Sequence, residues 1–394
     1  MITQKQFGDL ILTFTDSFDL RWNDKGSGAD RDGAYWHPNP PKGFHALGSV
    51  GVKGYSNING VEAAMCVKAV DGTDALKPPK SYELIWADHG SGADRDGSCW
   101  RPIAPEGYVA LGDVFVNGYD NPSQNDIMCV RKDLTSRGVI GAEIWADHGS
   151  GADHDIDTFE ILTNPKKIDA ECGEFAVNTF VANNAYREPT DAPEINTLYL
   201  PFPVVQQADP QAPTLTSNNI PPAYSGKTID RIVTVPFTAV KDDAFSTSWK
   251  VHNSPFYQVE RQIAYRRELF NHNQTSINQT VSKTVTTGVS QTQTESFSHT
   301  TGISVTAESG VSFLGTGGKV SATVSVELGW ESTTSVEEFR QDSILKQLVT
   351  PPEKSGALWA ISYKLMLLRE DNTHVGDQLV FDVNSFVEDE FPNS

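Results

Sequence analysis

The chain of 394 residues carries 31 lysines and arginines against 51 aspartates and glutamates, which gives a formal net charge of −20 at pH 7. Such a charge would repel phosphate backbones, so the composition argues against nucleic acid as a partner. Apolar residues make up 38% of the chain, and its 31 glycines and 22 prolines favour a turn-rich, mainly β protein.

The first ten residues, MITQKQFGDL, show no basic segment followed by an apolar stretch, and the chain has no run of about 18 apolar residues. We therefore expect a protein made in soluble form without a signal peptide. Of the four cysteines, Cys66 and Cys129 lie in matching Met-Cys-Val segments. This spacing predicts buried strand residues that act as small hydrophobic side chains.

One phrase occurs three times in the first half of the chain, as LRWNDKGSGADRDGAYW, LIWADHGSGADRDGSCW and EIWADHGSGADHDIDTF. Its tryptophans, Trp22, Trp86 and Trp145, are 64 and then 59 residues apart. A repeat of this length indicates one supersecondary unit used three times. Short alternating segments between turn residues follow each copy, and three equivalent sheets around an axis would form a β-prism. We expect the segment LILTFT (10–15) to complete the last sheet.

Each copy carries three carboxylates in a glycine-rich loop. They are Asp24, Asp30 and Asp32 in the first copy, Asp88, Asp94 and Asp96 in the second, and Asp147, Asp153 and Asp155 in the third. Alternating glycines permit positive φ and let a ligand approach the backbone amides. The carboxylates suit the vicinal hydroxyls of a glycan or a hard cation such as Ca²⁺, and they also suit a self-capped turn with no ligand. All three interpretations stay open, and no other cofactor is expected.

The phrase, with the W-x-P and P-x-G-[YF]-x-A-L-G segments that follow it, resembles the vacuolar-protein-sorting-associated-protein-sixty-two family over about residues 8–205. The matching positions are Trp22, Gly26, Gly28, Asp32, Trp36, Pro38, Gly43, Leu47 and Gly48, and then Trp86, Gly90, Gly92, Asp96, Trp100, Pro102, Gly107, Leu111 and Gly112. The resemblance implies a lectin-like β-prism, so we expect a cell-surface glycan or glycoconjugate as partner. Trp36 and Trp100 join the loop aspartates as candidate glycan-binding residues. The third copy departs from the pattern from Ile156 onward.

Prolines cluster between Leu200 and Ser225, which predicts a linker over 206–225. Residues 273–302 are dense in serine, threonine and glutamine, and we expect long exposed strands there. The predicted organisation is thus a receptor-binding domain over 1–205, the linker, and a second domain over 226–394.

Residues 303–328, the amphipathic segment, alternate strictly between apolar and polar side chains. The apolar positions are Ile303, Val305, Ala307, Val311, Phe313 and Leu314, then Val320, Ala322, Val324, Val326 and Leu328, while Glu308 and Glu327 lie in the opposite phase. This period predicts two strands, over 303–313 and 320–328, joined by a glycine-rich tip. A strand that crosses a bilayer in a barrel takes roughly 9–11 residues, which fits both strands. The alternative is a half-buried hairpin of an ordinary β-sandwich.

The order of elements resembles the aerolysin-like β-pore-forming toxins over about residues 226–394. Serine- and threonine-rich strands precede the amphipathic segment, a similar stretch follows it at 331–335, and a long strand is expected at 357–368. The resemblance implies an elongated β-sheet module whose hairpin is stored against the soluble protein and later joins a transmembrane barrel. In that barrel the apolar positions would face lipid, and Glu308 and Glu327 would line the lumen.

Together these features predict a mainly β, pore-forming toxin, insecticidal or defensive, that acts extracellularly on a target cell membrane as a homo-oligomeric ring. The alternative is a non-lytic carbohydrate-binding lectin or a membrane-trafficking adaptor. The sequence contains no GxSxG, HExxH, phosphate-binding glycine loop or paired-cysteine motif, so we expect no enzymatic activity.

Overall fold

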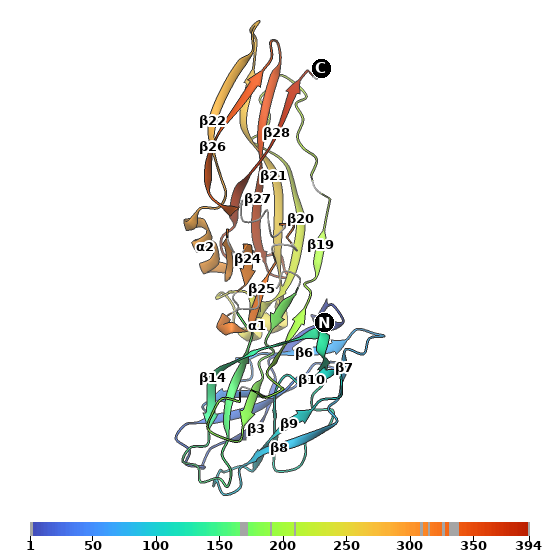
Figure 1. Cartoon of the computed structure of the whole chain (residues 1–394), viewed down its shortest axis with the longest axis vertical. Coiled ribbons are helices and arrows are strands. Elements are labelled where there is room, and N and C mark those ends of the chain that lie inside the picture. Colours follow the sequence, from blue (N-terminus) through green and yellow to red (C-terminus); the bar gives the residue numbers. More distant parts are fainter. Residues whose placement is uncertain are drawn as a thin grey trace.

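The computed structural model describes residues 3–165, 172–189, 191–208, 210–307, 310–313, 316–324, 328–330 and 339–392. Antiparallel strands dominate these residues, which confirms the prediction of a mainly β protein. Figure 1 shows an elongated molecule, with the three repeats at one end and the long strands of the second half extending to the other.

Each repeat contributes one three-stranded sheet that carries its glycine-rich loop. These sheets are β3 (Phe18–Asn23), β4 (Gly33–Pro38) and β5 (Val50–Lys53); β8 (Ser81–Ala87), β9 (Gly97–Ile103) and β11 (Val114–Asn117); and β14 (Val139–Ala146), β15 (Asp157–Leu162) and β17 (Phe180–Asn183). The glycine-rich loop joins the first two strands of each sheet. The three loops are therefore brought to equivalent positions by equivalent hairpins.

Each repeat also contributes strands to a second sheet. These strands are β1 (Lys5–Phe7), β2 (Leu10–Thr15) and β6 (Ala64–Ala69); β7 (Leu76–Lys77), β10 (Tyr108–Val109) and β12 (Cys129–Arg131); and β13 (Thr135–Arg137), β16 (Gly173–Phe175) and β18 (Asn196–Leu200), with the 3-10 turn η1 (Lys132–Leu134) between β12 and β13. Cys66 and Cys129 are buried in β6 and β12, as predicted.

The segment 10–15 does not complete the last sheet, so that prediction is wrong. It forms β2 and pairs with β1 and β6 of the first repeat, with Leu12 opposite Val67. This register places Leu12 and Val67 together in the largest hydrophobic core, which explains why the local pairing is preferred.

The second half is built on a five-stranded sheet in the order β19-β20-β21-β27-β28, with a two-stranded sheet of β22 and β26 beyond it. Their bounds are β19 (Val204–Gln206), β20 (Tyr224–Pro236), β21 (Phe256–His272), β22 (Gln279–Thr287), β26 (Asp342–Thr350), β27 (Ser355–Leu368) and β28 (Leu379–Phe391). Two helices, α1 (Thr247–Asn253) and α2 (Gln291–Thr301), and the 3-10 turn η2 (Phe237–Ala239) lie between these strands in the sequence. Among the described residues, no helix has both the length and the apolar character needed to cross a membrane.

The expectation of long strands throughout 273–302 is correct for β22 and wrong for α2. The Ser290 side chain accepts a hydrogen bond from the Gln293 amide, which caps the start of the helix. Gly302, with φ of 74°, ends it in the left-handed conformation. Phe297 is buried on the inner side of the helix. Local capping and one buried aromatic side chain thus outweigh the strand preference of the threonines.

The amphipathic segment is folded more tightly than predicted. Its first part forms two strands that pair with each other, β23 (Ile303–Thr306) and β24 (Gly310–Phe313), and β25 (Val320–Thr323) then pairs with β24. The 3-10 turn η3 (Thr316–Gly318) lies between β24 and β25. A single 11-residue strand over 303–313 is therefore a wrong prediction for this structure. Strand β24 runs antiparallel to β23, with Thr306 opposite Gly310, whose φ is 65°, and this pairing lets the apolar side chains of all three short strands reach one core.

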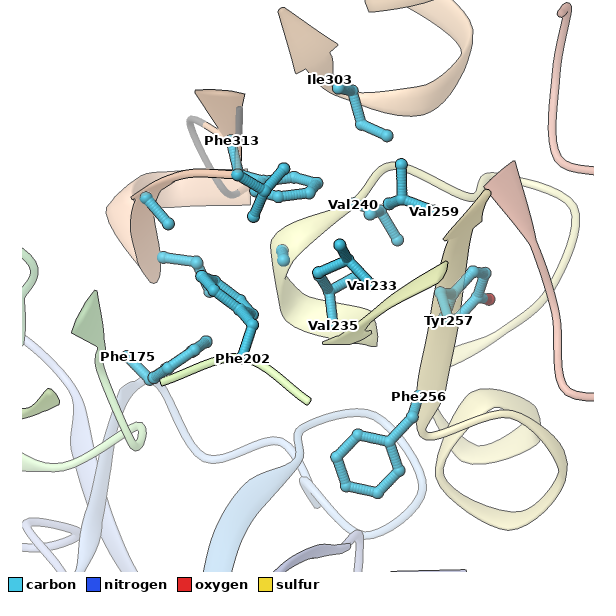
Figure 2. Packing of buried hydrophobic residues seen from close by; sticks show 14 of the residues in the cluster. Phe175, Phe202, Val233, Val235, Val240, Phe256, Tyr257, Val259, Ile303 and Phe313 are labelled. Carbon is cyan, nitrogen blue, oxygen red and sulfur yellow. The ribbon is translucent and has the colours of Figure 1, made fainter. Parts of the chain in front are cut away.

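The largest core runs through both halves of the chain. It contains Phe7 and Phe175 from the repeats together with Phe256 and Phe313 from the second half. Figure 2 shows Phe175, Phe202 and Phe313 close together in this core. The predicted division into 1–205, 206–225 and 226–394 stays a prediction, since packing is continuous across the middle segment.

Candidate functional site

The first aspartate of each loop is buried, and in the first two loops it binds the tryptophan of a neighbouring repeat. Asp24 Oδ1 accepts a hydrogen bond of 2.9 Å from the Gly33 amide, and Asp24 Oδ2 accepts one of 3.2 Å from Trp145 Nε1. In the same way, Trp22 Nε1 donates to Asp88 Oδ2 at 3.1 Å. A carboxylate that accepts such buried bonds orients its partners strongly. These aspartates therefore hold the repeats together.

The third repeat departs from this arrangement at Ile156, which stands where the first two copies have glycine. A Cβ at Gly97 would lie 2.2 Å from an atom of the Trp22 ring, so the indole can pack there only over glycine. The Trp86 indole, which faces the third repeat, donates to the His154 carbonyl at 2.8 Å. Each of the three tryptophans thus donates its indole N–H to a backbone carbonyl of a neighbouring repeat's loop, and this bond persists where the carboxylate bond does not.

The three glycine-rich loops bind one another in a closed cycle. The amide of the middle aspartate in each loop donates to a carbonyl of another loop: Asp94 to Lys25 at 2.6 Å, Asp153 to His89 at 2.9 Å and Asp30 to His148 at 2.8 Å. The glycines are needed because the loops approach closely. A Cβ at Gly26 would lie 2.7 Å from Asp94 Oδ1. The glycine-rich phrase therefore builds the cap of the three-repeat unit, in agreement with the structural interpretation of its spacing.

A tyrosine that the sequence analysis missed lies against each loop. Tyr119 donates its hydroxyl to Asp88 Oδ1 at 2.7 Å, and the His89 ring stacks on it with centroids 4.0 Å apart. The equivalent pairs are His148 on Tyr186, with centroids 3.6 Å apart, and Lys25 Nζ at 5.0 Å from the Tyr55 ring centroid. Tyr55 and Tyr119 both follow their repeat's tryptophan by 33 residues, which is the signal that could have found them.

These tyrosines keep their protons and stay hydrogen-bond donors. For Tyr119, desolvation and then the hydrogen bond to Asp88 raise the pKa above its ordinary value. The pKa of Tyr55 and that of Tyr186 are raised for the same reasons, with the corresponding aspartates as neighbours. Tyr119 is 38% exposed, so part of its ring remains open to a ligand.

The candidate glycan residues divide into buried and exposed groups. Trp36 and Trp100 are each 7% exposed, and Asp24, Asp88 and Asp147 are also buried, so these five side chains offer no surface to a glycan in this structure. Their assignment is corrected because their contacts are internal to the fold. The exposed aspartates are Asp30, Asp32, Asp94, Asp96, Asp153 and Asp155. Within the described part of the chain, no group of three or more histidine, cysteine, aspartate or glutamate side chains is arranged to hold a metal ion.

The predicted lipid-facing residues lie together in the core. Those that are buried are Ile303, Val305, Val311, Phe313, Val320, Ala322, Val324 and Leu328, and Ala307 packs against them half-buried. Leu314, Val326, Glu308 and Glu327 lie outside the described residues. The alternation thus separates an apolar face from one that carries hydroxyls, and in β24 and β25 the folded chain covers both, since Ser312, Ser321 and Thr323 are also buried.

Residues 6–201 match the family described as vacuolar protein sorting-associated protein 62, and residues 229–377 match the family described as Insecticidal Crystal Toxin, P42. We refer to these two matched segments, residues 6–201 and 229–377, as the Vps62 region and the toxin region. The recognition of each half from the sequence is thereby confirmed. No curated protein matches the chain.

Three solved structures are similar to all or part of the chain. GNIP1Aa from Chromobacterium piscinae is 28% identical over 47% of this chain and 35% of its own, with a TM-score of 0.39. Cry35Ab1 is 13% identical over 99% and 91% of the two chains, with a TM-score of 0.39, and pro-Monalysin, an oligomeric pore-forming toxin, is 7% identical over 36% and 64%, with a TM-score of 0.20. The chain therefore spans about a third of the length of GNIP1Aa.

A buried charged cluster joins the second and third repeats of the Vps62 region. Arg101 NH2 lies 3.0 Å from Asp113 Oδ2, and Arg101 Nε lies 2.8 Å from Glu194 Oε2. Burial and then the charge of Asp113 raise the pKa of Glu194 to about 8. One guanidinium thus faces two carboxylates, and we expect Glu194 to change its protonation state near pH 8.

Proposed function

We propose that the chain is a pore-forming toxin. Its Vps62 region binds a cell-surface glycan, and its toxin region assembles into a homo-oligomeric ring and inserts a β-barrel into the target membrane. The role is non-enzymatic, and the match to the insecticidal crystal toxin family supports the toxin class. The observation that carries the proposal is the burial of eight apolar side chains of the amphipathic segment, most of them in short, local strands.

Burial in short strands suits a segment that later enters lipid. Its apolar side chains are kept from water in the folded protein, and lipid would keep them from water again, so the transfer changes their environment little. Insertion into lipid is limited more by the backbone, since an isolated hairpin there leaves the amides of its edge strands without hydrogen-bond partners. Strands from several copies in a closed ring satisfy those amides, and this condition is why the proposal requires an oligomer.

The exposed residues at the loops favour a glycan as the ligand. Each repeat presents a tyrosine beside exposed aspartates, such as Tyr119 beside Asp96 and Tyr186 beside Asp155. Aromatic faces and carboxylates together suit the apolar face and the hydroxyls of a sugar. Three such groups on one rigid unit would bind a branched glycan with avidity, because the second and third contacts are intramolecular.

A dye-release experiment tests the proposal. Ser312 and Thr323 are partners across β24 and β25, so a disulfide between cysteines at these two positions would hold the two strands together. The Cys172→Ser background removes the half-buried native thiol. We expect dye release from liposomes of a target cell's lipid extract, abolished by the oxidised lock and restored by reductant. Failure to release dye from any membrane, together with binding to a glycan array, would favour the lectin or adaptor instead.

A further inference from the structure

The amphipathic segment shares a sheet with the third repeat. Strand β25 pairs with β16, with Glu174 opposite Ser321 and Phe175 opposite Val320. The sheet runs in the order β13-β18-β16-β25-β24-β23, so its first three strands come from the repeats and its last three from the amphipathic segment. The corresponding sheets of the first two repeats have three strands each. The third repeat therefore differs from the others in offering a strand edge to the toxin half.

Hydrogen bonds extend this contact beyond the paired strands. The Ala176 amide donates to the Lys319 carbonyl at 2.8 Å. The Thr163 amide and hydroxyl both donate to the Gly318 carbonyl, at 3.0 and 2.9 Å. We call these bonds and the β16–β25 pairing the hairpin junction. It holds the chain at and just before the start of β25.

Side chains also cross between the two halves. The Phe313 ring lies 6.3 Å from Phe202, which in turn lies 5.6 Å from Phe175. The same three rings are visible side by side in Figure 2. Lys319 Nζ lies 3.9 Å from Glu62 Oε2, so the first repeat also contacts the segment. Moving the amphipathic segment out of the core requires all these contacts to break.

Two features weaken the junction. Glu174 is 1% exposed, and its Oε2 accepts a bond from the Asn164 amide at 2.9 Å while Oε1 is buried without a hydrogen-bond partner. A buried oxygen without a partner makes the closed state less stable. In addition, residues of both segments, among them Gly317, Lys319, Leu162 and Ala176, line a pocket of about 180 Å³. The hairpin junction therefore pairs defined backbone groups, but its side chains do not fill all the space between the two segments.

We propose that the hairpin junction is an autoinhibitory contact. The third repeat holds the amphipathic segment in the core, and separation of β16 from β25 is the step that permits insertion. This inference rests on the proposed function. It explains how an event at the glycan-binding end could reach the toxin region, because β16 belongs to the repeat whose loop carries Asp153 and Asp155, with Tyr186 beside that loop.

A disulfide across the junction provides the test. Glu174→Cys with Ser321→Cys, in the Cys172→Ser background, would join β16 to β25 at partnered positions. The matched control is Ile11→Cys with Lys68→Cys, which joins β2 to β6 in the corresponding sheet of the first repeat. We expect the oxidised junction variant to bind target membranes like wild type, to release no dye, and to regain release on reduction. The oxidised control should release dye throughout. Equal release from the oxidised and reduced junction variants would overturn the inference.

A second measurement does not depend on pore formation. Thr163→Val removes the hydroxyl bond to the Gly318 carbonyl and keeps the side-chain shape. We expect amide hydrogen exchange over residues 310–324 to become roughly fivefold faster, as the loss of one hydrogen bond implies. The control is Thr73→Val, which removes a 2.8 Å hydroxyl bond to the Val70 carbonyl in the first repeat and should leave the exchange over residues 310–324 unchanged.

If wild type releases no dye but Thr163→Val speeds exchange, the proposed function fails and the contact stands. Unchanged exchange in Thr163→Val overturns the contact itself.

Discussion

Trp22 of the first repeat donates its indole N–H to Asp88 of the second repeat at 3.1 Å, and its ring packs over Gly97 of that same repeat. The three repeat tryptophans meet with ring centroids 5.1, 5.2 and 5.9 Å apart in near-perpendicular pairs, so each repeat completes the core of another. A single repeat could not bury its own tryptophan in this way. The loops, tryptophans and glycines therefore act as one cooperative unit.

Substitution of Gly97 tests this relationship. A Cβ at Gly97 would lie 2.2–2.9 Å from three Trp22 atoms, so Gly97→Ala must displace the indole and break its bond to Asp88. We expect the free energy of unfolding to fall by about 3 kcal/mol, measured by urea titration. Gly118→Ala, where φ is +80° but no atom lies within 4 Å, should cost only about 1 kcal/mol. Equal losses in the two variants would contradict the close packing.

The stability of the Vps62 region should depend on the protonation of Glu194. Its pKa is raised from 4.5 to about 8 by burial and by Asp113, so folding favours the protonated form. The stabilising contribution is complete below about pH 4.5 and is lost as the pH rises through 8. We expect wild type to lose roughly 2–4 kcal/mol over that range from this group. Glu194→Gln should flatten the slope, measured as urea midpoints at pH 5, 7 and 9, whereas Glu83→Gln at an exposed position should not.

The exposed loop carboxylates should control glycan affinity. We expect the combined variant Asp32→Asn, Asp96→Asn and Asp155→Asn to bind immobilised glycan at least tenfold more weakly, because each carboxylate–hydroxyl bond is charge-assisted. Surface plasmon resonance would measure the affinity, and the thermal unfolding temperature should change little. Asp120→Asn, at an exposed position near the second loop, is the control. Unaltered affinity in the combined variant would place the glycan elsewhere.

Glu308 and Glu327, in the polar phase of the amphipathic segment, should make the pore cation-selective. A ring of carboxylates attracts cations and repels anions within about one Debye length, roughly 8–10 Å at moderate salt. Glu308→Gln combined with Glu327→Gln should shift the reversal potential toward zero in planar-bilayer recordings under a salt gradient. Anion selectivity of wild type, or an unchanged reversal potential in the variant, would contradict the lumen assignment.

Part of the candidate site followed from the sequence, and part of it did not. The repeat phrase located the loops, and the alternation over 303–328 identified the apolar side chains that join the core, although it did not show that Ser312 and Ser321 are buried as well. The same pattern did not show that the segment folds back before Gly310, because side-chain alternation continues through a tight reversal. Nor did it find Tyr119, whose role depends on the distance between its hydroxyl and Asp88 rather than on its neighbours in the chain.

The sequence by itself determined the three-fold repeat, the mainly β class and the amphipathic character of residues 303–328, because periodicity and turn residues are local properties. Only the tertiary structure decided that Asp24 and Asp88 are buried links between repeats and that Trp36 and Trp100 belong to the core. Only the tertiary structure, too, joined β16 to β25, since 147 residues separate Glu174 from its partner Ser321 in the chain. Contacts over such distances depend on the packing of the whole chain, which no local pattern records.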